Sequence, residues 1–228
     1  MTSPARKHYQ RATAAQAAGA TDPRATQNGE QYELMAAALW EARRTLKGIK
    51  SLQAKIEKKR ELLPQFAPYI EGVLAAGNGA QDDVLMTALV WRIDVGDLKG
   101  ALDIAEYAMQ HNLQTPDRYE RDTASLVAEE SADQAMRMLA EESNDAAALV
   151  DLLDRAETLV EGHDMHDEIR AKLHKSLGYA HRQAGHPVGA LAHLKDALAL
   201  NERAGVKKDI EKLERELKNT APSDTAQG

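Results

Sequence analysis

The sequence of 228 residues contains no cysteine, which excludes disulfides, a thiol nucleophile and cysteine-ligated metal sites. Aromatic residues make up only 4% of the chain, and runs of β-branched residues are missing, whereas alanine is abundant. A core with so few large side chains is built by helices that touch at alanine rather than by a sheet. We therefore predict an all-α fold in a reducing compartment.

Long apolar runs are missing as well. The longest one, Val84–Trp91, is interrupted by Thr87 and is far shorter than the roughly 20 residues that a membrane-spanning helix needs. The first residues of the chain contain no continuous apolar segment of the kind found in secretory signals. We expect a soluble, cytoplasmic protein with no membrane partner.

Positive charge is concentrated at one end of the chain. Residues 1–60 contain 12 Lys and Arg against 5 Asp and Glu, whereas the whole chain has a net charge of −7. Such polarity suggests that the basic segment meets a polyanion and that the acidic remainder does not. An exposed helix can carry the same charges as an ordinary solvated surface, which is the alternative interpretation.

Two prolines and two glycines punctuate residues 1–29, which we interpret as a basic, flexible N-terminal arm. Basic arms often follow DNA phosphates, and the alternative is a solvated tail without a partner. The candidate DNA-binding residues of the arm are Arg6, Lys7 and Arg11.

Residues 30–63 follow an unbroken 3-4 spacing that predicts one long, coiled-coil-like helix of roughly 50 Å. A narrow apolar seam on so long a helix favours self-association, and an antiparallel partner within the same chain is the alternative. The candidate oligomerisation residues are Met35, Leu39, Leu46, Ile49, Ile56 and Leu63. Basic residues mostly avoid this seam, and the candidate DNA-binding residues among them are Arg43, Arg44, Lys47, Lys50, Lys55, Lys58 and Lys59.

Residues 64–205 are predicted to form an acidic domain of helical hairpins that starts where Pro64 ends the long helix. Gly96, Ala101, Leu102 and Ala108 recur 89 residues later as Gly185, Ala190, Leu191 and Ala197. This spacing resembles tetratricopeptide-type hairpins, although two separated units do not make a regular array. We expect helices over 80–96, 101–111, 123–142, 145–161, 167–184 and 188–204. At the end of the chain we expect a short amphipathic helix over 206–220, followed by a disordered tail over 221–228.

Motifs for catalysis or metal binding are weak. The GxxxxGK[ST] phosphate loop is absent, which argues against an ATP motor in this chain. Residues 163–168 contain histidine and carboxylate ligands for a divalent ion, but their acidic residues also suit the start of a helix. His174 and His181 share one helical face, where neutral packing is the ordinary role. We predict no metal ligand, cofactor or catalytic residue.

Asp82 and Asp83 follow a glycine-rich turn. A pair of carboxylates could hold Mg²⁺ for phosphodiester cleavage, but adjacent residues on a helix point in different directions. Capping the helix that starts near Ala80 explains them more simply.

Several short segments of the sequence occur in the same order as in one viral protein family. They are Arg44–Lys47, Lys58–Pro64, Gly79–Asp83, Trp91-Arg92 with Gly96-Asp97, Ala171–Lys175, Gly189–Leu194 and Ala204–Lys208. On these segments the chain resembles the small terminase subunit of peduovirus-type temperate tailed phages over nearly its whole length, and residues 112–165 match least well.

The resemblance implies a role in viral genome packaging in the host cytoplasm. A subunit of this family binds the cohesive-end site of concatemeric double-stranded viral DNA and presents it to a large terminase subunit, on which Mg²⁺ and ATP are expected. Because no nuclease motif is evident, we expect this chain to form a homo-oligomer that directs cleavage without performing it. Two alternatives remain: a metal-dependent endonuclease using Asp82, Asp83 or residues 163–168, and a helical scaffold without DNA contact.

Overall fold

The computed structural model describes residues 3–20, 22, 25–116, 121–141 and 145–220. These residues form eleven α-helices and one 3₁₀ turn, and no strand is assigned among them. The all-α prediction is confirmed. No helix within the described ranges combines the length and apolarity needed to cross a membrane. The tail predicted over 221–228 lies outside the described residues.

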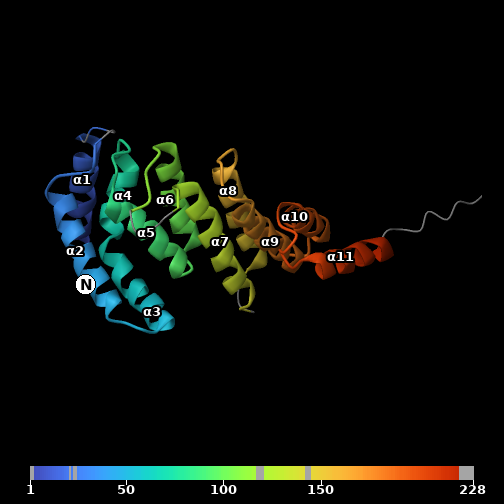
Figure 1. The fold of residues 1–228 in the computed structure, drawn as a ribbon. Coiled ribbons are helices and arrows are strands. Elements are labelled where there is room, and N and C mark those ends of the chain that lie inside the picture. The colour runs from blue at the N-terminus through green and yellow to red at the C-terminus, as the bar shows by residue number, and fades with distance from the viewer. Residues whose placement is uncertain (1–2, 21, 23–24, 117–120, 142–144, 221–228) are drawn as a thin grey trace, which may run out of the picture. The chain divides into compact units, whose positions relative to one another are not determined.

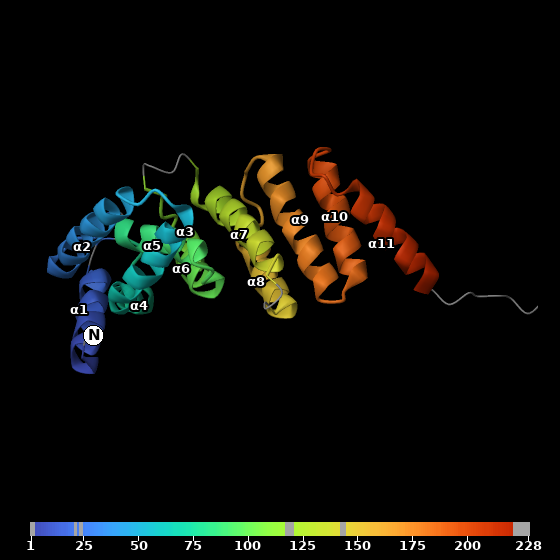
Figure 2. The ribbon, with the colours of Figure 1, turned by 90° about the horizontal axis from the view of Figure 1, so that it is seen from below.

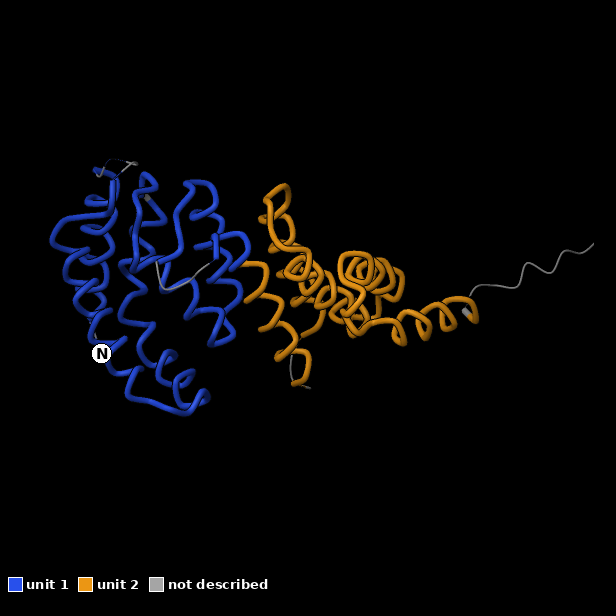
Figure 3. The backbone as a smooth tube through the Cα atoms, in the orientation of Figure 1, with its two compact units in different colours: residues 1–126 blue, residues 127–228 orange. Residues whose placement is uncertain are grey.

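The chain divides into two compact units, residues 1–126 and 127–228 (Figure 3). The helices of the first unit are α1 (Pro4–Ala20), α2 (Glu30–Lys47), α3 (Leu52–Leu62), η1 (Leu63–Gln65), α4 (Ala67–Ala76), α5 (Asp83–Asp94) and α6 (Leu98–Gln110) (Figure 1). α7 (Thr123–Leu139) contains the division, and α8 (Ala146–Val160), α9 (Asp167–Gln183), α10 (Pro187–Leu200) and α11 (Lys207–Thr220) follow (Figure 2). Each helix predicted between residues 80 and 220 has a counterpart here.

Residues 4–20 do not form the flexible arm that we expected. They form α1, which packs against α4 and buries Ala14 and Ala18. Gly72 makes this approach possible, because a Cβ there would lie 2.4 Å from the carbonyl oxygen of Arg11. Small residues on both helices therefore let two backbones come close, and this pairing is not visible in either segment alone.

The single long helix over 30–63 is not confirmed, because the chain turns between α2 and α3 (Figure 1). Gly48 caps the end of α2, and the Ser51 side chain accepts a hydrogen bond of 3.3 Å from the Ala54 amide at the start of α3. Glycine disfavours a helix interior and serine favours an N-cap. These two local preferences outweigh the continuous 3-4 spacing.

The apolar seam of α2 is covered within one chain. Met35, Leu39 and Leu46 are buried, and α2 contacts α1 and α5. Their burial requires no second copy, so the oligomerisation role of these three residues stays a prediction that the packing of the single chain does not call for. The other seam residues, Ile49, Ile56 and Leu63, are half-buried.

α5 is the central helix of the first unit. Its residues from Val84 to Trp91 are all buried, as an apolar run without an outer face requires. The ring of Phe66 meets Trp91 edge to face, with centroids 6.2 Å apart. α2 and α3 both pack against this buried helix.

The helix pairs α5–α6 and α9–α10 share the features that their sequence spacing predicted. Gly96 and Gly185, which follow the first helix of each pair, have positive φ angles of 87° and 80°, and Ala101 and Ala190 are buried. At Gly178 a Cβ would lie 2.6 Å from Cδ2 of Leu194, so close packing of α9 on α10 requires glycine. Tetratricopeptide-like packing itself stays a prediction.

Candidate nucleic-acid interface

The predicted DNA-binding residues fall on α1, α2, α3 and the connection between α2 and α3. Arg6, Lys7 and Arg11 are exposed on α1, and Arg11 lies 3.8 Å from the Glu71 carboxylate. Arg44 and Lys47 occupy the last turn of α2, where cations complement the helix dipole. Lys50 follows in the connection, and Lys55, Lys58 and Lys59 lie on α3.

Two of these cations hold the fold together instead of facing solvent. An Nη of Arg43 donates a 2.6 Å hydrogen bond to Oγ1 of the buried Thr87 on α5. Lys59 pairs with Asp94 at the end of α5, and both side chains are largely buried. Arg43 and Lys59 therefore leave the set of DNA-binding candidates, because moving them to a phosphate would break contacts between α5 and its neighbours.

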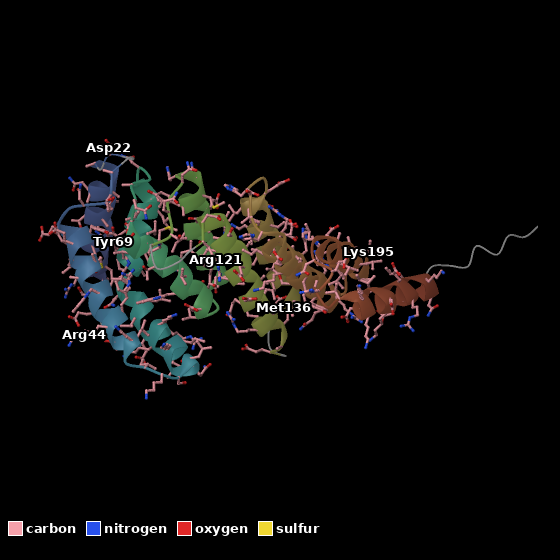
Figure 4. All side chains as sticks on the ribbon, viewed as in Figure 1. Asp22, Arg44, Tyr69, Arg121, Met136 and Lys195 are labelled. Carbon is pink, nitrogen blue, oxygen red and sulfur yellow. The ribbon has the colours of Figure 1, made fainter. Side chains whose placement is uncertain are left out.

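The remaining cations differ in how freely they meet solvent. Lys58 forms a 2.8 Å ion pair with Glu61, and Lys55 is half-buried. Lys47 and Lys50 are exposed, and the side chain of Arg44 is 71% exposed at the outer side of α2 (Figure 4). Among the predicted cations of α2, α3 and their connection, the most accessible thus lie at the end of α2 and just beyond it.

An exposed aromatic residue accompanies these charges. Trp40 is 60% exposed, and the Arg44 guanidinium lies 5.7 Å from its ring centroid. We call Trp40, Arg44, Lys47 and Lys50 the basic corner. Trp40 lies off the apolar seam and was therefore not among the predicted residues, although a tryptophan four residues before an arginine on a helix is a usable signal.

Asp82 is the N-cap of α5, and Asp83 lies in the first turn of that helix. The buried Asp82 carboxylate accepts hydrogen bonds from the amides of Val84 and Leu85, both 2.9 Å, and from the Tyr69 hydroxyl at 2.6 Å. Burial raises the pKa of Asp82 to about 6, against the lowering effect of these hydrogen bonds. The capping interpretation is confirmed, and Asp82 has no open side for a magnesium ion and its DNA substrate.

Residues 163–168 also behave as a helix start. His166 is the N-cap of α9, and Asp167 and Glu168 lie in its first turn. The described residues that could hold a metal ion form two groups elsewhere, Asp154–His181–His193 and Glu157–His174–His193. The shared face of His174 and His181 is visible in the sequence, but the partners that α8 and α10 supply are not. Only the packing of three helices brings these side chains together.

Comparison with known proteins gives consistent matches. The family model described as "Phage small terminase subunit" matches residues 36–168, a span that includes the basic corner and α5. The chain is 47% identical over 219 residues to the "Terminase, endonuclease subunit" of Escherichia phage P2, covering 96% of this chain and 87% of that protein. It is 26% identical over 104 residues to the "Probable terminase, endonuclease subunit" of Haemophilus phage HP1, covering 45% and 37% of the two chains. No solved structure matches.

Proposed function

Since this chain belongs to the phage small terminase subunit family, we propose that it binds the cohesive-end site of concatemeric viral DNA. Bound there, it directs cleavage and packaging of the DNA by the large ATPase subunit. It acts in the host cytoplasm, as a homo-oligomer. Mg²⁺ and ATP serve the large subunit, and the acidic remainder of the chain docks that subunit.

The basic corner is the observation that carries this proposal. Arg44, Lys47 and Lys50 follow one another at an exposed helix end, in a chain that is acidic overall. Cations on such a surface bind DNA phosphates and release counterions from the duplex. The π face of Trp40 adds a planar apolar contact for a sugar or an unstacked base. Arg6 and Lys7 on α1 provide further exposed positive charge within the same unit.

Phosphate contacts hold DNA without reading its sequence. Several copies on one site multiply such contacts, because each added contact then forms within an existing complex. Self-association therefore fits the proposal, through a surface other than the buried seam of α2.

A charge-reversal variant tests the proposal. Changing Arg44, Lys47 and Lys50 together to Glu is expected to weaken binding to a cohesive-end duplex and to flatten the slope of log K against log salt by about 2 to 3. The matched control changes the exposed Arg203, Lys207 and Lys208 of the second unit to Glu, which alters net charge equally. Fluorescence anisotropy over a salt series measures both, and equal losses in the two variants would refute the proposed role of the basic corner.

The names of both relatives contain the word endonuclease, which favours a second candidate function, namely that this chain cuts DNA itself. The buried, hydrogen-bonded state of Asp82 counts against a nuclease site at the start of α5. Incubating the purified chain with cohesive-end DNA and Mg²⁺, with and without the large subunit, separates the two candidates. Cleavage by this chain without the large subunit would support the second candidate function, an endonuclease.

A further inference from the structure

A cluster of histidines and carboxylates in the second unit has no part in the proposed DNA contact. His174 and His181 lie two turns apart on α9, and His193 faces them from α10. Asp154 and Glu157 on α8 reach the same rings. Three helices therefore contribute ligand-type side chains to one place.

Three atoms of this cluster have the spacing of metal ligands. Nδ1 of His174 lies 3.2 Å from Oε1 of Glu157 and 3.2 Å from Nδ1 of His193, and the third distance, from that Oε1 to Nδ1 of His193, is 3.9 Å. A tetrahedral zinc ion with bonds of about 2.0 to 2.1 Å keeps its ligand atoms about 3.3 Å apart. Small side-chain rotations would bring all three atoms to that spacing.

The charges around the cluster also favour a cation. Burial and the nearby Asp154, Asp196 and Glu161 raise the pKa of Glu157, although His174 opposes this. The imidazole rings of His174 and His193 lie half-buried beside these carboxylates. A divalent ion would relieve the crowding of carboxylates and accept both imidazoles.

One further polar atom is unsatisfied at this place. Nδ1 of His181 is buried and has no hydrogen-bond partner among the described residues, and its ring stacks on His193 with centroids 5.2 Å apart. A histidine stack of this kind is a poor core for three helices, because each ring contains a polar atom that needs a partner. His181 is not one of the three residues described above, so the spacing of those three atoms, and not this unsatisfied atom, indicates a metal ion.

We propose that Glu157, His174 and His193 bind one zinc-class divalent ion that joins α8, α9 and α10, with water at the fourth position. Two imidazoles select such a transition metal over Mg²⁺ or Ca²⁺, which prefer oxygen ligands. The side chains of Glu157, His174 and His193 are 34%, 17% and 19% exposed, so the ion can enter and keep a water ligand. Its role is to brace the three helices, and this proposal is independent of the proposed DNA binding.

Metal titration of the full-length chain tests this site. After treatment with a chelator, the wild type is expected to bind one equivalent of Zn²⁺ by calorimetry and to melt at a higher temperature when loaded. Co²⁺ in its place should produce the intense visible absorption of a tetrahedral site. The absence of saturable Zn²⁺ binding would overturn the proposal.

Single variants identify the ligands. His174→Gln and His193→Gln are each expected to weaken Zn²⁺ binding at least about tenfold, and Glu157→Gln to weaken it while preserving side-chain size. The matched control is His163→Gln, at an exposed histidine outside the cluster, with folding of every variant checked by circular dichroism. Binding lost in His181→Gln but retained in His174→Gln would assign the ion to the other group and would refute the site proposed here.

Discussion

At the scale of single residues, Asp82 shows how one buried carboxylate can combine several structural roles. It caps α5, and it accepts a hydrogen bond from the hydroxyl of Tyr69 on α4. Burial raises the pKa of the Tyr69 phenol, and the charge of Asp82 and the same hydrogen bond raise it further. The pair therefore links two helices through a polar contact that water does not reach.

We predict that Asp82→Ala lowers the free energy of unfolding by about 2 to 4 kcal/mol, because it removes a cap and leaves the buried Tyr69 hydroxyl without its acceptor. Asp82→Asn retains an oxygen for the amides of α5 and should cost much less. Chemical denaturation followed by circular dichroism measures both. Equal losses for the two variants would contradict the capping role.

The same residue predicts a pH dependence. In the folded chain the pKa of Asp82 is about 6, above its ordinary value of 3.8, so the folded state binds the proton more tightly than the unfolded state. Its stabilising contribution is complete below about pH 4 and is lost as the pH rises through 6. Relative to Asp82→Asn, the wild type should therefore become less stable between pH 4 and 7. A difference that stays constant over this range would contradict the prediction.

At the scale of helices, the contact between α1 and α4 depends on the absence of a side chain at Gly72. The analogous absence at Gly178 lets Leu194 of α10 pack on α9. In both pairs a glycine inside a helix lowers the local helix propensity, and close packing compensates for that loss.

Gly72→Ala is expected to destabilise the chain by about 1 to 3 kcal/mol, since its Cβ would lie 2.4 Å from the backbone oxygen of Arg11 and α1 would have to shift. Gly48→Ala is the matched control: its Cβ would meet its nearest neighbour at 3.4 Å, and its φ of −74° suits alanine. That variant should be neutral or slightly stabilising. Thermal melts of both proteins check this, and equal melting temperatures would refute close packing at Gly72.

At the scale of the whole molecule, a core substitution in the apolar seam of α2 distinguishes packing within one chain from contact between copies. Leu39 is 3% exposed within a single chain, so Leu39→Ala is expected to cost about 2 to 5 kcal/mol of stability by leaving a cavity. It should leave the subunit count unchanged. Native mass spectrometry at a temperature where the variant stays folded, with and without cohesive-end DNA, measures that count. If this variant dissociated an oligomer, the result would support the prediction that the apolar seam of α2 contacts another copy.

Local signals in the amino-acid order were sufficient for much of the fold. Alanine-rich 3-4 spacing predicts helices, Pro64 ends one, and Asp82 starts another at the expected place. The concentration of basic residues in 1–60 is likewise plain from composition. These features depend on residues that are close in the sequence, so they can be recognised without knowing which helices pack against each other.

Packing between distant segments decided the rest. The 3-4 spacing continues past Lys47, but Gly48 and Ser51 divide it, and α1 and α5 cover the seam. Arg43 and Lys59 cannot be told from their exposed neighbours until α5 is placed beside them. The histidine cluster arises in the same way, from side chains up to 39 positions apart, between Asp154 and His193. Helix caps and hydrophobic periodicity depend on a few neighbouring residues. Which helix packs against a given apolar face depends on the whole chain, because all apolar faces compete for burial.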